Sequence, residues 1–216
     1  MNRREFSAAA LLAGAGASLA APAARAQGSQ FAAGTDYAVL DKRAPVEAPA
    51  GKIEVIEFFW YSCPHCNAFE PALDQWVAKL PKDVFMRRVP VQFNPGFEPE
   101  QRLYYTLKEM GKIDELHVKV FHAIHVEHLP LDKESGIVDW ARKQGLDMTK
   151  FGQIYNSFSV ATKVRQAVEL QNVYKVTGVP AMGVAGRFYT DGELAKGMDR
   201  CLRVVDFLID KARKGA

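Results

Sequence analysis

Apolar and polar residues follow two different periods along this chain, and these periods predict where strands and helices lie. An apolar run over residues 53–60, broken by two glutamates, predicts a buried strand. Apolar residues three and four positions apart over residues 63–80 predict a helix. Residues 84–93 predict a second strand, in which Pro90 indicates a sheet edge or a bulge. Together these segments predict a strand–helix–strand unit.

The helical period continues through residues 98–173, where strand signals are few. Apolar stripes at helical spacing mark this block: Leu103, Leu107 and Met110; then Leu116, Val120, Ile124 and Leu129; then Val138 and Ala141; then Val160, Val164 and Val168. Strand signals return over residues 178–184 and 187–189, and Ala185-Gly186 between them predicts a hairpin turn. A last helix follows, with one apolar face that includes Cys201.

The order of these elements predicts an α/β fold, namely a thioredoxin fold with an inserted helical domain. We expect residues 27–96 and 174–216 to form the thioredoxin-like domain and residues 97–173 to form the inserted helical domain. Residues 28–50 are rich in Ala, Gly and Pro, so we expect them to lead into the fold as an extended segment.

The N-terminal residues have the pattern of an export signal. Arg3 and Arg4 precede an apolar, alanine-rich stretch over residues 6–20 that is too short to span a membrane. Ala24-Arg25-Ala26 then has the small-x-small pattern of a cleavage site. We therefore expect a signal peptide over residues 1–26 and an exported mature protein. Because the two arginines also resemble a twin-arginine signal, the general and the twin-arginine export routes both remain open.

Composition and charge narrow the function classes. The chain has 216 residues, of which 48% are hydrophobic and 25% charged, as is ordinary for globular proteins. Two of its three net positive charges lie in the expected signal peptide, so we expect no binding to nucleic acid. One close cysteine pair and one odd cysteine do not make a disulfide-stapled scaffold in an exported protein of this size. The pair is therefore expected to carry chemistry.

That pair lies in Cys63-Pro64-His65-Cys66, directly after the first predicted strand. Two thiols at this spacing, between a strand and a helix, are typical of a thiol–disulfide exchange site. Pro64 suits the first helical turn, which places Cys63 near the N-cap, where unpaired backbone N–H groups and a protonated His65 stabilise its thiolate. We predict that Cys63 exchanges and Cys66 resolves. We also predict an oxidant, because the reduced form is stabilised.

Other interpretations of the pair remain open. A structural disulfide would use the same two thiols, and a zinc half-site would also need a second Cys or His pair. Covalent haem requires histidine directly after the second cysteine, where this chain has Asn67. We expect solvated or core-edge positions, rather than a metal site, for four histidines of the helical block: His117, His122, His125 and His128. No cofactor is expected.

Several motifs together resemble the DsbA family of periplasmic thiol:disulfide oxidases. They are Glu57-Phe58-Phe59, the Cys-Pro-His-Cys motif, Phe69-Glu70 and Gly178-Val179-Pro180-Ala181-Met182, and the resemblance covers essentially the whole mature chain. It implies that Val179-Pro180 forms a cis-proline loop against the active-site disulfide, where the Val179 backbone pairs with a client segment. It also implies that Glu57 lies buried beneath the site as a proton acceptor for Cys66. The alternative for Glu57 is a solvent-facing glutamate at the strand edge.

Three features depart from the best-known member of that family. Arg88 stands where that member has lysine, and because arginine does not exchange protons in this range, a relay through this position is not expected. Tyr61-Ser62 replaces aromatic residues ahead of the motif, a change that bears on contacts with clients or partners. The second cysteine pair is missing, and Cys201 is expected to be a buried, inert thiol.

These patterns predict a monomeric periplasmic thiol:disulfide oxidoreductase. It would donate the Cys63–Cys66 disulfide to newly exported or unfolded proteins that contain cysteine, through a mixed disulfide on Cys63. The resemblance implies that a DsbB-like membrane quinone reductase reoxidises it. The alternatives are a disulfide isomerase or reductase and, in a different class, a non-catalytic metal- or peptide-binding module.

Overall fold

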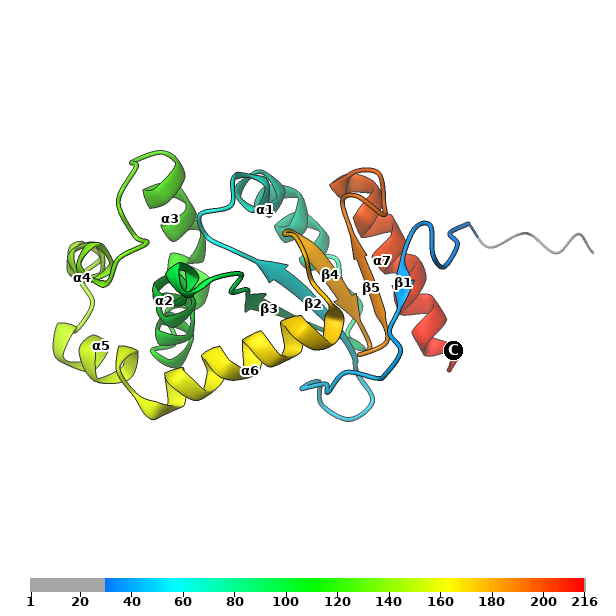
Figure 1. Cartoon of the computed structure of the whole chain (residues 1–216), viewed down its shortest axis with the longest axis horizontal. Coiled ribbons are helices and arrows are strands. Elements are labelled where there is room, and N and C mark those ends of the chain that lie inside the picture. The colour runs from blue at the N-terminus through cyan, green and yellow to red at the C-terminus, as the bar shows by residue number, and fades with distance from the viewer. Residues whose placement is uncertain (1–29, 216) are drawn as a thin grey trace, which may run out of the picture. The chain divides into compact units, whose positions relative to one another are not determined.

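The computed structural model describes residues 30–215, and the order of its elements follows the predicted plan (Figure 1). The strands are β1 Ala38–Val39, β2 Ile53–Phe59, β3 Val84–Pro90, β4 Ala181–Val184 and β5 Phe188–Asp191. The helices are α1 Pro64–Val77, α2 Glu98–Glu109, α3 Ile113–His125, α4 Glu134–Lys143, α5 Met148–Tyr155, α6 Phe158–Tyr174 and α7 Met198–Arg213, and the short 3-10 helix η1 Pro95–Phe97 precedes α2. The predicted signal peptide lies outside the described residues.

The strands form one five-stranded sheet in the order β1-β5-β4-β2-β3. β2 and β3 run parallel with Glu57 opposite Arg88, and β4 lies antiparallel between β2 and β5. A parallel pair needs a crossover connection, which α1 supplies. β3 lies at the edge of the sheet and ends at Pro90, which confirms the predicted edge position of that proline.

The segment before β2 contributes a strand of its own. Ala38 and Val39 pair antiparallel with Tyr189 and Phe188 of β5 and so extend the sheet by one edge strand. The prediction of an extended lead-in was therefore incomplete. A strand of two residues is too short to show an alternating pattern, and so no sequence pattern predicts it.

Helices cover both faces of the sheet (Figure 1). α1 and α7 pack on one face, where Phe69, Leu73 and Val205 are buried in one apolar cluster with residues of the strands. α6 lies on the other face, and Phe58 of β2 packs against Tyr174 of α6 with their ring centroids 5.1 Å apart. Helices cover β2 on both faces, which explains why its sequence is almost continuously apolar. This strand is the buried strand predicted from the apolar run over residues 53–60.

Helices α2 to α6 form the predicted block between β3 and β4, although the sequence did not mark α5 as a separate helix. The stripe predicted for α6 is only partly right. Val160 and Val164 are buried, but Val168 is only half-buried, and Ala167 and Leu170 carry the buried face onward. A spacing of four residues drifts around a helix that has 3.6 residues in each turn, so a strict repeat of four leaves the buried face.

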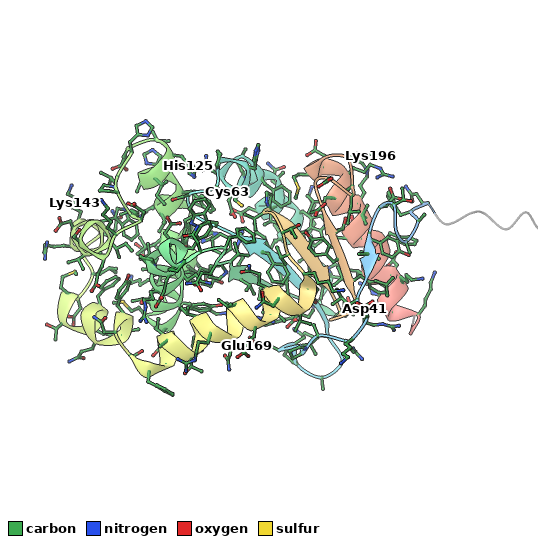
Figure 2. The ribbon with its side chains drawn as sticks, viewed as in Figure 1. Asp41, Cys63, His125, Lys143, Glu169 and Lys196 are labelled. Atoms are coloured by element: carbon green, nitrogen blue, oxygen red, sulfur yellow. The ribbon has the colours of Figure 1, made fainter. Side chains whose placement is uncertain are left out.

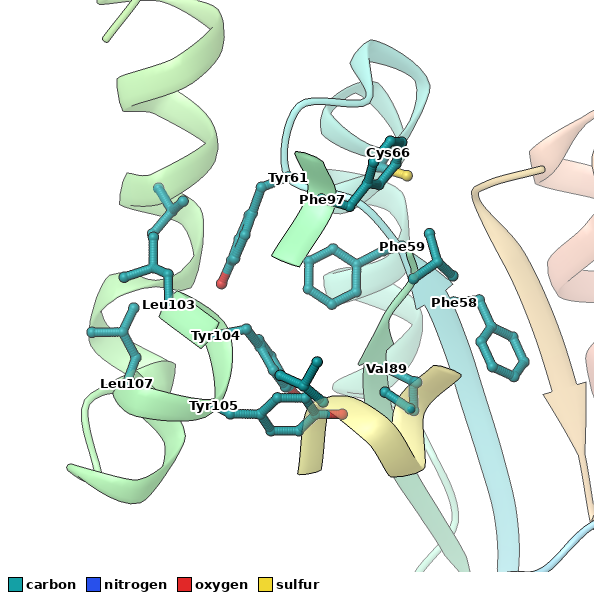
Figure 3. Packing of buried hydrophobic residues seen from close by; sticks show 14 of the residues in the cluster. Phe58, Phe59, Tyr61, Cys66, Val89, Phe97, Leu103, Tyr104, Tyr105 and Leu107 are labelled. Carbon is teal, nitrogen blue, oxygen red and sulfur yellow. The ribbon is translucent and has the colours of Figure 1, made fainter. Parts of the chain in front are cut away.

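The helical block shares its core with the sheet, as Figure 3 shows for one part of the interface. There, Phe59 of β2 packs against Tyr104 of α2, with their ring centroids 5.4 Å apart. The described residues from Phe31 onward form one compact unit. The division of this unit into two domains at residues 97–173 stays a prediction.

Candidate active site

The cysteine pair lies where β2 ends and α1 begins. After β2, residues 60–63 form a turn, which is closed by a hydrogen bond of 3.1 Å from the Cys63 N–H to the Trp60 carbonyl. α1 begins at Pro64, and Cys63 is its N-cap residue in an extended conformation. Because proline has no N–H to leave unpaired and its φ is already helical, it suits the first position of a helix. The N-cap position predicted for Cys63 is therefore confirmed.

The sulfur of Cys63 lies in an environment that favours its thiolate. A hydrogen bond from the Cys66 thiol lowers the pKa of Cys63 most, and the backbone N–H groups of Cys66 and His65 and the charge of His65 lower it further. Partial burial opposes these effects, and the resulting pKa is about 6. At neutral pH, Cys63 is therefore mainly ionised. His65 and Pro64 are exposed beside it.

Cys66 lies one helical turn deeper and is fully buried. Burial raises the pKa of the Cys66 thiol far above its ordinary value, and the hydrogen bond to Cys63 and the charge of Glu57 add to this effect. Both cysteines are free thiols in the structure. The two neighbouring sulfurs therefore have opposite preferences, one for the thiolate and the other for the thiol.

The loop that precedes β4 lies against Cys63. The Cys63 thiol faces the Val179 carbonyl oxygen at 3.5 Å, and the Val179–Pro180 peptide bond is cis, as the resemblance implied. A cavity of about 330 Å³ opens beside this loop. It is lined by His65, Thr177, Gly178, Val179, Pro180, Asp191, Gly192, Glu193, Gly197 and Met198. The loop and the cavity thus lie next to the sulfur that the sequence predicts to exchange.

Glu57 lies on β2, on the sheet face that α1 covers, and it is fully buried. Arg88 donates a hydrogen bond of 3.0 Å to Oε2, whereas Oε1 has no partner among the described residues. Burial raises the pKa of Glu57 well above its ordinary value, the charge of Glu70 adds to the rise, and Arg88 opposes it. The alternative of a solvent-facing glutamate is therefore wrong. Its role as a proton acceptor stays a prediction.

Arg88 holds three carboxylates together beneath the cysteine pair. Its guanidinium contacts Glu57 and Glu70 at 3.0 Å each and Asp74 at 2.7 Å. Although burial works against the charge of Arg88, the negative charges of Glu57 and Glu70 more than compensate and raise its pKa. Arg88 is therefore a fixed cation, and the absence of a proton relay through this position stays a prediction.

The structure shows contacts of Tyr61 and Ser62 that the sequence did not reveal. Tyr61 is fully buried, and its hydroxyl lies 2.8 Å from Nδ1 of His117. The N–H of Ser62 donates to Glu100, which is 38 positions later in the chain. An effect of Tyr61 on clients would therefore be indirect. Nothing in the sequence around Glu100 marked it as a neighbour of the cysteine motif.

The remaining candidate residues occupy structural positions. Cys201 is fully buried on α7, and burial raises its pKa to about 12, as expected of an unreactive thiol. His122 pairs with Glu127 at the surface, whereas His125 donates to a backbone carbonyl. Among residues 30–215, no group of three or more His, Cys, Asp or Glu side chains is arranged to hold a metal ion. None of the described helices is long and apolar enough to cross a bilayer.

Comparison with known proteins gives consistent matches. Residues 54–208 match the DSBA-like thioredoxin domain family. The thiol:disulfide interchange protein DsbA of Bordetella parapertussis is 44% identical over 198 residues, which cover 91% of each chain. The protein of the same name from Pseudomonas aeruginosa (strain PAO1) is 41% identical over 191 residues, which cover 88% of this chain and 90% of that protein. The crystal structure of Pseudomonas aeruginosa DsbA superposes with a TM-score of 0.81 at 40% identity, covering 86% of this chain and 96% of that one.

These matches confirm the predicted fold class and the predicted chemistry. The structural neighbours have the thioredoxin-like fold, and the curated relatives are thiol:disulfide interchange proteins. The chain is therefore an oxidoreductase that forms disulfide bonds in proteins that contain cysteine. It belongs to the DSBA-like thioredoxin domain family.

Proposed function

We propose that Cys63–Cys66 is the redox-active disulfide and that the protein donates it to newly exported proteins. The observation that carries this proposal is the contrast between the two sulfurs: the pKa of Cys63 is lowered to about 6, and burial raises that of Cys66. A thiolate that forms readily stabilises the reduced enzyme. An enzyme with a stabilised reduced form gives its disulfide away.

The first step is attack by a client thiolate on the Cys63 sulfur. The new bond joins the client sulfur to Cys63, the Cys63–Cys66 bond breaks, and its electron pair goes to the Cys66 sulfur. Because the environment of Cys66 disfavours a thiolate, this sulfur takes up a proton as it leaves. Glu57 is suited to supply that proton, since burial raises its pKa and its Oε1 has no other partner.

The second step releases the oxidised client. A second client thiolate attacks the client sulfur of the mixed disulfide, and Cys63 leaves as a thiolate. Thiols of low pKa leave faster, so the environment that lowers the pKa of Cys63 also favours this step. During reoxidation the first proton transfer runs backwards, and Glu57 then accepts a proton from Cys66.

The groove beside Val179 and Pro180 is the proposed client site. The cavity of about 330 Å³ opens directly beside His65 and the loop that faces the Cys63 sulfur. An extended client segment could pair there with the Val179 backbone, strand to strand. Because backbone pairing does not depend on client side chains, this mode would accept many different sequences.

Localisation and partners complete the proposal. The export pattern of residues 1–26 supports a periplasmic enzyme. Membership of the family supports a DsbB-like membrane quinone reductase as the partner that reoxidises Cys63–Cys66. We also propose that the enzyme is a monomer, because one chain supplies both cysteines and the adjoining loop.

Oxidation of a reduced peptide with two cysteines tests the function. Catalytic amounts of the protein, with glutathione disulfide as the oxidant, should oxidise the peptide faster than glutathione disulfide alone. Cys63→Ser should abolish this activity, and Cys66→Ala should accumulate mixed disulfides, whereas Cys201→Ala should retain full activity as the matched control. Rearrangement of wrongly paired disulfides without net oxidation would instead indicate an isomerase.

A further inference from the structure

The two residues that precede the cysteine motif are held by polar side chains of α2 and α3. Glu100 of α2 accepts hydrogen bonds from both the N–H of Ser62, at 3.0 Å, and its hydroxyl, at 2.5 Å. His125 of α3 donates through Nε2 to the Tyr61 carbonyl at 2.8 Å. His117, also of α3, lies 2.8 Å from the Tyr61 hydroxyl. We call Glu100, His117 and His125 the turn clamp.

The position of the clamp follows from the turn between β2 and α1. Tyr61 and Ser62 are the two central residues of this turn, which the hydrogen bond from the Cys63 N–H to the Trp60 carbonyl closes. Figure 2 shows Cys63 at the end of the loop that leaves β2, with His125 of α3 near it. The backbone carbonyl of one central residue and the backbone N–H of the other are therefore bound by different helices. Movement of α2 or α3 would reach the turn directly.

Glu100 and His117 of the turn clamp are buried, so water cannot easily replace their hydrogen bonds to the turn. Glu100 is 1% exposed, and burial raises its pKa to about 7 against the lowering effect of the Ser62 hydrogen bonds. His117 is also buried, and its Nε2 lies 3.4 Å from a carboxylate oxygen of Glu70. His117 thus lies between the Tyr61 hydroxyl and the Glu70 carboxylate, with one ring nitrogen facing each. The hydroxyl and carbonyl of Tyr61 and the N–H and hydroxyl of Ser62 thus each have a partner on α2 or α3.

We infer that the turn clamp positions Cys63 for thiol exchange, an inference that rests on the proposed role of Cys63 as the exchanging thiol. The Cys63 sulfur gains its stabilisation from the Cys66 thiol and from N–H groups at the first turn of α1, and hydrogen bonds weaken steeply when their geometry is lost. A turn held by three side chains from two helices keeps the sulfur over those groups. Glu100, His117 and His125 are therefore positioning residues, since they act through Tyr61 and Ser62.

The helical block therefore also has a role in the chemistry, because it holds the turn that carries Cys63. Glu100, His117 and His125 all lie in the block inserted between β3 and β4, far along the chain from the turn that they hold. Figure 3 shows the Tyr61 side chain between the cysteine region and Leu103 of α2. Its ring packs against those of Phe59 and Phe121, with centroids 5.0 Å away in each case. The block thus holds the turn by apolar as well as polar contacts.

Titration of the Cys63 thiolate in the reduced protein, followed by ultraviolet absorbance, tests the inference. Two pairs of variants separate hydrogen bonding from other effects: Glu100→Ala against Glu100→Gln, and His125→Ala against His125→Gln. Glutamine can keep the bond to the turn, and in Glu100→Gln it also removes the charge. We expect each Ala variant to have a Cys63 pKa about half a unit above its Gln partner, which is about a threefold loss of thiolate stabilisation. Two controls on the same helices, Glu98→Gln and His122→Ala, touch no residue of the turn and should match the wild type.

Equal Cys63 pKa values in the Ala and Gln members of both pairs would overturn the inference and leave the contacts as structural. If Glu100→Ala does not fold, His125→Ala carries the test, because His125 is only half-buried at the end of α3. The titration requires no oxidation of a client. Failure of the wild type to oxidise a peptide would therefore reject the proposed function without deciding the role of the clamp.

Discussion

The two faces of the sheet carry two buried glutamate–arginine pairs that differ in how the oxygens of the glutamate are bonded. On the face covered by α6, both oxygens of Glu54 are bonded, to Arg87 and to the N–H of Glu47. On the face covered by α1, beneath the cysteines, Glu57 is bonded to Arg88 through one oxygen only, and the other has no partner among the described residues. A satisfied buried carboxylate stabilises the fold, whereas an unsatisfied one beside a thiol is available to move a proton.

Removal of each glutamate should have very different effects on stability. Glu54→Ala leaves Arg87, whose side chain is only 9% exposed, with the exposed Glu47 as its remaining carboxylate partner, so we expect the free energy of unfolding to fall by about 3 kcal/mol. Glu57→Ala should cost much less, because Arg88 keeps Glu70 and Asp74 as partners. Denaturant unfolding of both variants checks this, and equal losses would contradict the comparison.

Glu100 extends the comparison to a third buried carboxylate. Its folded pKa of about 7 lies above its ordinary value of 4.5, so the stability that its proton provides is complete below about pH 4.5 and is lost as the pH rises to about 7. Glu100→Gln stays neutral throughout. The variant should therefore gain on the order of 2 kcal/mol relative to the wild type between these pH values. Glu98→Gln, at a side chain that is 40% exposed, should show no such gain. Parallel stability curves for Glu100→Gln and wild type would argue against a buried charge on Glu100.

The element order and the cysteine motif were predictable because their signals are local. The apolar run of β2 and the Cys-Pro-His-Cys motif each occupy a few consecutive residues, and they placed Cys63 at the start of α1 correctly. The contact of Glu100 with Ser62 depends instead on how α2 packs against the turn, and no sequence pattern encodes that packing. Burial of Glu57 was implied by the family resemblance, and its unbonded oxygen was not predictable at all.

Glu57→Gln should slow thiol exchange about tenfold at neutral pH, because the variant has no acidic proton to give to Cys66 and no carboxylate to take it back. The pH dependence of exchange should lose the ionisation that belongs to Glu57, whose pKa is raised by burial. Stopped-flow measurement of exchange with a reduced peptide checks both effects. Glu54→Gln, on the opposite face, is the matched control, and an unchanged pH profile in Glu57→Gln would remove Glu57 from the mechanism.

Cys201→Ala should have the smallest effect. The thiol is fully buried on α7, so its removal leaves a small cavity, and we expect a loss of about 1 kcal/mol in the free energy of unfolding. Activity should not change, because Cys201 belongs to the apolar cluster of the α7 face and makes no contact with the cysteine pair. A peptide oxidation assay checks this, and a marked loss of activity at full stability would show a function for Cys201 that its burial does not suggest.

The redox equilibrium of Cys63–Cys66 with glutathione tests the central claim most directly. If the environment of Cys63 stabilises the reduced form, the reduction potential should lie at about −120 mV, the established value of DsbA. A potential near about −270 mV, as in thioredoxin, would mark a reductant and would contradict the claim that the thiolate drives disulfide donation.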